Sequence, residues 1–307
     1  MKLFYAPYQL LKKGCSGFRS GALLKAVFGG DKIGYADCHP WPELGDYPLN
    51  VQLELLSKQI TTSLTKQSLQ FAKIDADARQ SEIHLFEGLI VPPSHYLLNS
   101  FQDEIPEGFV LCKLKLGKEP QYELKNLTDF FLHLPQHIRV RFDFNNRIDK
   151  TTFLLYLKCF EPYFEKIDFI EDPFPYDLDE WEKIQRFYPV KLALDRHEGA
   201  YKENVCSFAV RIQKPAVQQV DLSANRNVIT SYLDHPLGQM AASYTASLLK
   251  KEAPEKILSC GLLSHTSYHT NKYSERFKEQ GDQFCPPKEG FGFGFDSLLI
   301  KENWIIL

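Results

Sequence analysis

The sequence predicts an α/β fold, a (β/α)7β-type TIM barrel with an α+β capping domain, and three observations favour it. Five short apolar runs each end in ionisable residues, as barrel strands do where they open into a site. Neighbouring charged positions of these runs lie 19 to 28 residues apart, about the length of one strand, one helix and two loops. The chain of 307 residues also exceeds the roughly 250 residues of a bare barrel. The runs cover residues 111–115, 140–145, 167–171, 192–195 and 210–214.

Three segments are expected along the chain. Residues 1–92 form the α+β capping domain, residues 93–285 form the barrel, and residues 286–307 return to the cap. Within the cap, apolar stretches separated by turns predict short antiparallel strands, and apolar residues at helical spacing over residues 49–83 predict two or three helices. The predicted strands cover residues 3–8, 23–28 and 33–36.

Eight strands are predicted for the barrel. Residues 96–98 open it, the five charged runs follow, and residues 228–231 and 257–259 are apolar and β-compatible enough to complete it. The stretch between Lys214 and Val228 is too short for a full helix, so we expect a trimmed connection there. The predicted helices cover residues 124–131, 151–160, 178–188 and 238–250.

Composition and charge favour a small-molecule partner. The chain carries 36 basic and 39 acidic residues, a formal charge of −3, without a basic block, so electrostatics gives no reason to expect nucleic acid. No uncharged apolar run reaches the ~18 residues of a membrane span, and the first residues lack the pattern of a secretory leader, so we expect no membrane partner and a cytoplasmic protein. The seven cysteines are scattered without a CxxC pair, which argues against disulfides and structural zinc. A monomer and a homo-oligomer are both compatible with the sequence.

The two lysines of the first charged run are expected to point in one direction. Residues two apart in a strand share a face, so Lys113 and Lys115 lie together while Leu114 and Leu116 face the helices. Two ammonium groups in a barrel lumen repel each other. This repulsion, with partial burial, is expected to lower the pKa of at least one of them towards the range of a general base. The competing interpretation places both lysines on a solvated edge strand.

Acidic side chains end the next strands. Asp143, Glu171 and Asp195 would face the same mouth, where three carboxylates repel one another unless a hard cation neutralises them. Oxygen-only ligands favour Mg²⁺ over zinc. Taken singly, each carboxylate is more often a surface or cap residue, and Asp172 before Pro173 is typical of a turn. The joint pattern nevertheless predicts a magnesium site.

The charged residues form a series that resembles a known one. The series is similar to that of the active site in the enolase superfamily, in particular its muconate-lactonizing subgroup, and the likeness spans almost the whole chain. Within that subgroup the chain most resembles the o-succinylbenzoate synthase family, through its compact length, residues 34–40 and residues 231–238. The series reads Lys113-x-Lys115, Arg141-x-Asp143-x-Asn145, Glu171-Asp172-Pro173, Asp195 and Lys214-Pro215.

The resemblance implies a metal site and a base. Asp143, Glu171 and Asp195 would hold Mg²⁺, with Mn²⁺ as the alternative ion. Lys115 would remove the proton α to the carboxylate of a small-molecule carboxylate substrate, and Lys214 would stand on the opposite face of that substrate.

The resemblance also implies a reaction, the syn dehydration of 2-succinyl-6-hydroxy-2,4-cyclohexadiene-1-carboxylate to 2-succinylbenzoate in menaquinone biosynthesis. The protein would then be a carbon–oxygen lyase that stabilises an enediolate with its metal. Lys113 would hold the substrate carboxylate or lower the pKa of Lys115. Arg141 and Asn145 would contact the metal ligands without binding the metal themselves.

Substrate contacts are expected from three residues outside this series. Arg19, in the loop of residues 12–20, is the predicted anion contact. Ser231 and Ser259, at the ends of the last two strands, would bind the succinyl carboxylate through hydroxyl or backbone N–H groups. Two positions depart from the family pattern. Relatives commonly have a glutamate where this chain has Arg196, which would place a positive charge beside the third metal ligand, and this chain has Asp37 where a glutamate is usual.

Two other functions stay open at this point. A racemase or epimerase of N-acylamino acids or dipeptides also requires two opposed lysines. Dipeptide epimerases usually carry an Asp-x-Asp pair on the last strand, where this chain reads Ser259-Cys260-Gly261-Leu262. The second alternative is a non-catalytic barrel that binds a carboxylate. Arg196 favours that alternative, and the intact series of lysines and carboxylates argues against it.

Overall fold

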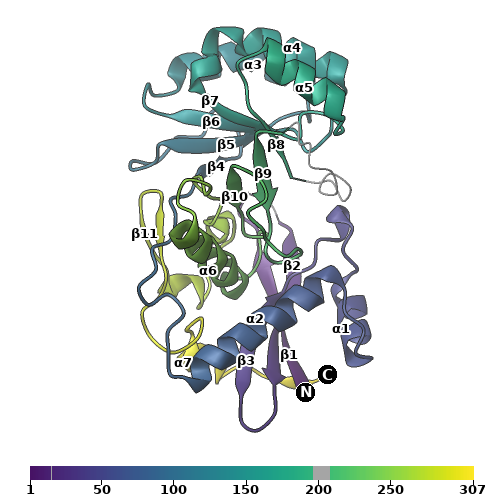
Figure 1. The fold of residues 1–307 in the computed structure, drawn as a ribbon, viewed down its shortest axis with the longest axis vertical. Helices are drawn as coiled ribbons and strands as arrows, with labels where there is room; N and C mark the ends of the chain where they lie inside the picture. Colours follow the sequence, from purple (N-terminus) through teal and green to yellow (C-terminus); the bar gives the residue numbers. More distant parts are fainter. Residues whose placement is uncertain (15, 196–207) are drawn as a thin grey trace. The chain divides into compact units, whose positions relative to one another are not determined.

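The computed structural model describes residues 1–14, 16–195 and 208–307. The chain divides into two compact units, named here the cap unit and the barrel unit (Figure 1). The predicted domain boundaries after residues 92 and 285 stay a prediction. The cap unit consists of Met1–Pro93, Gln213–Asp221 and Ile229–Leu307, and the barrel unit of Ser94–Ile212 and Leu222–Val228.

A four-stranded antiparallel sheet is the framework of the cap unit. Buried and half-buried residues alternate along its third strand, which is the pattern of a strand with one face on the core. The three predicted strands are confirmed, and the first two extend further than predicted because they pair as one long hairpin. In the order β13-β1-β2-β3, the strands are β1 (Lys2–Leu11), β2 (Phe18–Val27), β3 (Ile33–Cys38) and β13 (Ile305–Ile306).

Two helices follow the third strand of the cap, as the apolar spacing predicts. They are α1 (Leu49–Ser57) and α2 (Ser63–Gln80). Thr62 caps α2 by accepting a hydrogen bond from a backbone N–H of its first turn. The helix α2 runs along the sheet and packs closely on β3 (Figure 1). A Cβ atom at Gly34 would lie 1.8 Å from the carbonyl oxygen of Ala72, so this close approach requires glycine.

The remaining elements of the cap unit, apart from one short 3-10 turn, come from the second half of the chain. The predicted helix over residues 238–250 is confirmed and is longer at both ends. At its N-terminal end Pro236 suits the first turn, because a proline lacks the N–H group that would have no helical partner there. The elements are α6 (Pro236–Glu252), α7 (Asp296–Leu299), β11 (Lys278–Gln280), β12 (Gln283–Cys285) and the short 3-10 turns η1 (Pro42–Leu44), η3 (Ser264–Ser267) and η4 (Ser274–Arg276).

The barrel unit is built on a parallel sheet whose strands lie side by side in chain order. Apolar residues on one face of this sheet pack on helices, and the charged strand ends lie on the other face. All five charged runs form strands where they were predicted. The seven strands are β4 (Tyr96–Leu98), β5 (Leu111–Lys115), β6 (Arg139–Asp143), β7 (Ile167–Glu171), β8 (Leu192–Leu194), β9 (Val210–Gln213) and β10 (Asn227–Ile229).

In the part of the chain that the structure describes, three helices cover the apolar face of this sheet (Figure 1). Leu114, Phe142 and Ile170 point into the core that the helices close, and the ring of Phe142 stacks on that of Phe160 with centroids 4.7 Å apart. The predicted helices are confirmed within a few residues. They are α3 (Pro120–His133), α4 (Lys150–Phe160), which a short 3-10 turn η2 (Glu161–Lys166) extends, and α5 (Leu178–Phe187).

One predicted strand is wrong. Residues 257–259 do not form a strand. Ile257, Cys260 and Gly261 are isolated bridge residues, and Gly261 pairs in parallel with Thr230. The carbonyl of Ile257 accepts a hydrogen bond from the side chain of Lys250, so this apolar stretch satisfies part of its backbone outside a ladder. The trimmed connection is confirmed, since residues 215–226 contain no helix. Among the described residues, none of the helices has the length and apolar character that crossing a bilayer requires.

Candidate active site

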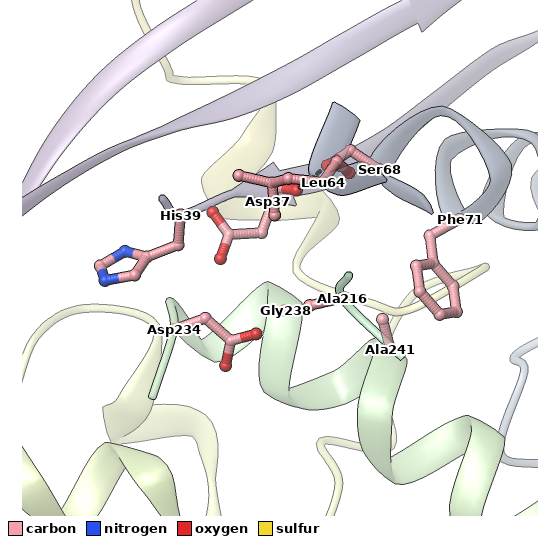
Figure 2. Close-up of a pocket in the computed structure, with 9 residues that line it drawn as sticks. All are labelled: Asp37, His39, Leu64, Ser68, Phe71, Ala216, Asp234, Gly238 and Ala241. Carbon is pink, nitrogen blue, oxygen red and sulfur yellow. Dashed lines mark hydrogen bonds between the residues drawn. The ribbon is translucent and has the colours of Figure 1, made fainter. Parts of the chain in front are cut away.

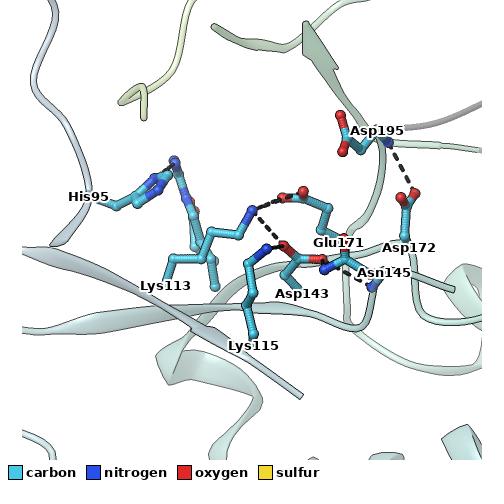
Figure 3. Close-up of polar contacts among 10 residues, drawn as sticks. His95, Lys113, Lys115, Asp143, Asn145, Glu171, Asp172 and Asp195 are labelled. Atoms are coloured by element: carbon cyan, nitrogen blue, oxygen red, sulfur yellow. Dashed lines mark hydrogen bonds and ion pairs between the residues drawn. The ribbon is translucent and has the colours of Figure 1, made fainter. Parts of the chain in front are cut away.

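Lys113 lies among buried carboxylates on the face of the barrel sheet opposite the helices (Figure 3). Its Nζ atom is 2.9 Å from Asp143 Oδ2 and 2.7 Å from Glu171 Oε2. Burial by itself would lower the pKa of Lys113, but the charges of Asp143 and Glu171 outweigh burial and raise this pKa above its ordinary value. Lys113 is therefore not a lysine whose pKa is lowered, and it stays an ammonium ion.

Lys115 follows on the same face, as the strand period predicts. The register of β5 and β6 places Lys115 opposite Asp143, and its Nζ atom lies 3.8 Å from Asp143 Oδ2. The Lys115 side chain is 39% exposed, whereas that of Lys113 is 11% exposed. One lysine is thus held inside the carboxylate cluster, and the other, at the end of the strand, is partly open to solvent.

Asn145 orients the first carboxylate. Its backbone N–H and its side-chain Nδ2 both donate to Asp143 Oδ1, at 3.1 and 2.8 Å. This leaves Oδ2 of Asp143 directed at the two lysines. Asn145 has a positive φ of 50°, a conformation that asparagine tolerates better than most residues. Its predicted supporting role therefore has a geometric basis.

Two further carboxylates extend the cluster beyond Glu171 (Figure 3). Asp172 is buried with a φ of 43°, and its Oδ1 accepts the backbone N–H of Asp195 at 3.0 Å. Burial raises the pKa of Asp172 well above its ordinary value, and the charges of Asp195 and Glu171 raise it further. Sequence reasoning treated Asp172 as a turn residue. Its left-handed backbone places it inside the cluster, and this is not visible in a strand pattern.

The composition of this cluster fits a hard cation. Among the described residues, no three His, Cys, Asp or Glu side chains already stand in the arrangement of a metal site. Lys113 Nζ lies between Asp143 and Glu171, where a positive charge is required. All the acidic donors are carboxylate oxygens, and the ammonium of Lys113 offsets only part of their charge. Such a donor set suits Mg²⁺ or Mn²⁺ better than zinc.

Arg141 belongs to a separate layer of the same face. Its Nε donates to Asp168 Oδ2 at 2.8 Å, its Nη1 lies 3.0 Å from His95 Nδ1, and its guanidinium lies 4.5 Å from the centre of the Phe169 ring. A register shift between β6 and β7 allows successive residues of β7 to contact one arginine. Burial, followed by the charges of Arg141 and Lys113, lowers the pKa of His95 well below its ordinary value. Sequence reasoning missed His95, because nothing in its own segment marks it.

Arg19, the predicted anion contact, is a residue of β2 and not of a loop. Its guanidinium forms an ion pair with Glu43 and lies 4.2 Å from the centre of the Trp41 ring. The loop expected over residues 12–20 is shorter, because β1 continues to residue 11 and β2 starts at residue 18. The hydrogen bonding of a long hairpin accounts for this difference.

The other predicted contacts also belong to the cap unit. Lys214 directly follows β9. Ser231 is buried, and its hydroxyl donates to the carbonyl of Gly261 at 3.2 Å, while Ser259 is half-buried just before that residue. Arg196 lies outside the described residues. The functional roles of these residues stay predictions.

A second buried acidic pair lies within the cap unit (Figure 2). The carboxylates of Asp37 and Asp234 line a cavity of about 20 Å³, and both Oδ2 atoms crowd Gly238, where a Cβ would lie 2.7 and 2.6 Å from them. Asp37 accepts hydrogen bonds from the hydroxyl of Tyr8 at 2.6 Å and the backbone N–H of His235 at 3.0 Å. Burial raises the pKa of Asp37 to about 7, although both hydrogen bonds oppose it. This pair ties β3 to the start of α6, and sequence reasoning missed it because its members are far apart in the chain.

The fold and the site together define a class. Solved structures of that class match the whole chain at low sequence identity. A mandelate racemase/muconate lactonizing enzyme from Roseiflexus has a TM-score of 0.80 at 12% identity, with 95% of this chain and 96% of that chain covered. A dipeptide epimerase from Cytophaga hutchinsonii, solved with Mg and the dipeptide D-Ala-L-Val, has a TM-score of 0.76 at 14% identity, with 100% and 99% covered. The fold is therefore a capping domain with a (β/α)7β barrel, the architecture of the muconate-lactonizing enzymes of the enolase superfamily.

Sequence comparison identifies the family within this class. Residues 3–78 match the model described as O-succinylbenzoate synthase, N-terminal domain. A relative from Bdellovibrio bacteriovorus, named o-succinylbenzoate synthase, is 32% identical, and the match covers 99% of this chain and 98% of that protein. The chain belongs to the o-succinylbenzoate synthase family, a family of carbon–oxygen lyases, and it is an enzyme of this type.

Proposed function

We propose that the protein catalyses the Mg²⁺-dependent syn dehydration of 2-succinyl-6-hydroxy-2,4-cyclohexadiene-1-carboxylate to 2-succinylbenzoate, a step of menaquinone biosynthesis. The observation that carries this proposal is the pairing of β5 with β6, which directs Lys113 and Lys115 at the carboxylate of Asp143. Full-length similarity to a named o-succinylbenzoate synthase supports the choice of substrate. A cytoplasmic location stays a prediction, and a monomer and a homo-oligomer both stay open.

Three carboxylates are proposed to hold the metal. Asp143, Glu171 and Asp195 would be the ligands, with Mg²⁺ as the ion and Mn²⁺ as its alternative. When bound, the metal would supply Lewis-acid stabilisation of the negative charge that develops on the substrate carboxylate. Asn145 holds one oxygen of Asp143 and so presents the other. Asp172 holds the backbone N–H of Asp195 and supports the third ligand at its main chain.

Lys115 is proposed as the base. It is the more exposed of the two lysines and sits at the end of its strand, where it can take the proton α to the carboxylate. In a syn dehydration the same group, now an ammonium, can return this proton to the departing hydroxyl, so one residue serves both steps. Lys113 stays charged beside the carboxylates and would hold the substrate carboxylate by electrostatic attraction.

Four further residues complete the proposal. Lys214 would stabilise charge from the second face of the substrate ring, as a cation over its π-system. Arg19, Ser231 and Ser259 would contact the succinyl end of the substrate. Each of these roles follows from the family resemblance and from the chemistry of the side chain.

The test is direct turnover. Incubation of the enzyme with the cyclohexadiene substrate and Mg²⁺ should produce an aromatic product that is followed by its ultraviolet absorbance, and chelation of Mg²⁺ should stop the reaction. Lys115→Ala should reduce turnover by about 10²-fold to 10⁴-fold, which is the usual contribution of a general base. The variant should stay folded. Lys125→Ala, which removes an exposed lysine of α3, is the matched control and should be fully active.

Two outcomes would overturn the proposal. Solvent-deuterium exchange at the α-carbon of N-succinylamino acids, without any dehydration of the cyclohexadiene, would identify a racemase. Binding of the carboxylate product by a protein that shows neither reaction would identify a non-catalytic barrel.

A further inference from the structure

A buried glutamate of α3 holds the loop that leaves β5. Each oxygen of the Glu123 carboxylate accepts two hydrogen bonds. Oε2 accepts from the backbone N–H of Gly117 at 2.7 Å and from the hydroxyl of Tyr156, and Oε1 accepts from the N–H groups of Lys118 and Glu119 at 3.0 Å each. Glu123 is 5% exposed, so its charge is taken out of water. Burial of a carboxylate is costly unless hydrogen bonds replace its hydration, and here four of them do.

The held loop begins directly after the proposed base. Lys115 ends β5, Leu116 donates its backbone N–H to the carbonyl of Asp143 at 2.9 Å, and Gly117 turns the chain with a φ of 86°. The N–H groups of Gly117, Lys118 and Glu119 come before the first turn of α3, which begins at Pro120, so the helix offers them no carbonyl partners. Glu123 satisfies all three and closes this loop against the start of its own helix.

The hydroxyl of Tyr156 brings a second helix into the arrangement. Tyr156 lies on α4 and is fully buried, and its hydroxyl donates to the carboxylate of Glu123. The helix α4 follows β6, the strand that ends with Asp143. The strand that carries the base and the strand that carries a proposed metal ligand pair directly along their length, and two further links join them beyond the strand ends. One link is the main-chain bond from Leu116 to Asp143, and the other is the contact between Glu123 and Tyr156.

We propose that Glu123, supported by Tyr156, is a positioning residue that holds Lys115 in register with the carboxylate cluster. This inference rests on the proposed function, in which Lys115 is the base. Glu123 contacts neither the cluster nor Lys115 directly, and it acts through the main chain of residues 116–119. Because a displacement of about 1 Å at a reacting group can cost ~10²-fold in rate, a loosened loop should be detected as lost turnover.

Glu123→Gln tests the proposal with almost no change of volume. Since each carboxylate oxygen accepts two bonds, the amide nitrogen of glutamine must face two donors whichever way it is placed. We expect kcat to fall by about 10-fold to 100-fold, with KM for the cyclohexadiene substrate changed less than about 3-fold. Hydrogen–deuterium exchange of the amides of residues 116–119 should increase, while other strand ends keep their rates. Tyr156→Phe leaves three of the four bonds and should give a smaller loss of kcat.

Asp75→Asn is the matched control for a purely structural effect. Asp75 is a buried carboxylate of the cap unit that accepts the backbone N–H groups of Tyr35 and Phe293, at 2.9 and 2.7 Å, and the guanidinium of Arg79. Its loss should lower the melting temperature with kcat unchanged. The proposal would be overturned if Glu123→Gln also lowered only the melting temperature. The proposed function fails separately, when the wild-type enzyme does not turn over the substrate.

Discussion

Replacing each lysine of β5 by methionine tests the electrostatic role of the two residues separately. Methionine keeps most of the side-chain length and removes the charge. Lys113→Met takes a positive charge from between Asp143 and Glu171, which are each 3% exposed. Lys115→Met takes a charge from a side chain that is 39% exposed and lies 3.8 Å from Asp143. The two substitutions are identical in chemistry, and they lie two residues apart on one face of one strand. The difference between their effects on stability therefore measures how burial changes the contribution of the lysine charge.

The expected effects differ by several kcal/mol. Removal of one partner from a buried ion pair typically costs about 3–5 kcal/mol, because a buried charge loses its compensation, and here two buried carboxylates lose the ammonium that they share. Removal of an exposed partner costs at most about 1 kcal/mol. At about 2–4 °C per kcal/mol for a chain of this size class, Lys113→Met should lower the melting temperature by roughly 6–20 °C in a metal-free buffer, and Lys115→Met by less than about 4 °C.

The assay is thermal unfolding with a chelator and again with excess Mg²⁺. Added Mg²⁺ should recover part of the loss in Lys113→Met, because a cation that binds the carboxylates of the folded state replaces the missing charge. The reasoning fails if both variants melt within about 2 °C of the wild type without metal. It also fails if Mg²⁺ stabilises Lys113→Met no more than it stabilises the wild type.

Two further predictions concern the cap unit. Burial raises the pKa of Asp37 to about 7, so the folded state binds a proton at this carboxylate more tightly than the unfolded state does. The free energy of unfolding should therefore fall by up to about 4 kcal/mol as pH rises from about 4 to about 7. Asp37→Asn should make the melting temperature depend less steeply on pH over this range. Asp31→Asn, at an exposed position, is the control and should leave this pH dependence unchanged. An unchanged pH dependence in Asp37→Asn would contradict the raised pKa of Asp37. Gly34→Ala should cost at least about 3 kcal/mol, because its Cβ would overlap the main chain of α2, whereas Gly29→Ala has open space and should be neutral. Equal soluble yields and melting temperatures of these two glycine variants would rule out the predicted overlap.

Local rules were enough for most of the secondary structure. The alternation in residues 111–115 placed Lys113 and Lys115 on one face because side chains of a strand alternate whatever the strand packs on. The spacing of charged runs placed β5 to β9 correctly for a similar reason, since one strand, one helix and two loops need a nearly constant length of chain. The failure at residues 257–259 is of the opposite kind. Whether an apolar stretch forms a ladder depends on its partners, and a strand pattern does not report them.

The site residues also divide into those that local rules predict and those that depend on contacts between distant segments. Asp143, Glu171 and Asp195 were predicted as a group because they recur at strand ends, and Asp143 and Glu171 do share Lys113. The inclusion of Asp172 depends on a left-handed backbone that its sequence, typical of a turn, does not reveal. The role of Glu123 depends on a tight loop and on the position of α4. These features need coordinates because they are set by a few dihedral angles and by contacts between distant segments.

For this protein, the order of amino acids by itself determined which side chains share a face and how often a charged strand end recurs, because both follow from the period and length of secondary structure. Only the tertiary structure decided which of those charges meet and which of them are buried. It made Lys113 the buried counter-ion and left Lys115 exposed, although the two are neighbours on one strand face. The physical reason is that the energy of a charge depends on its surroundings, and packing between distant segments creates those surroundings.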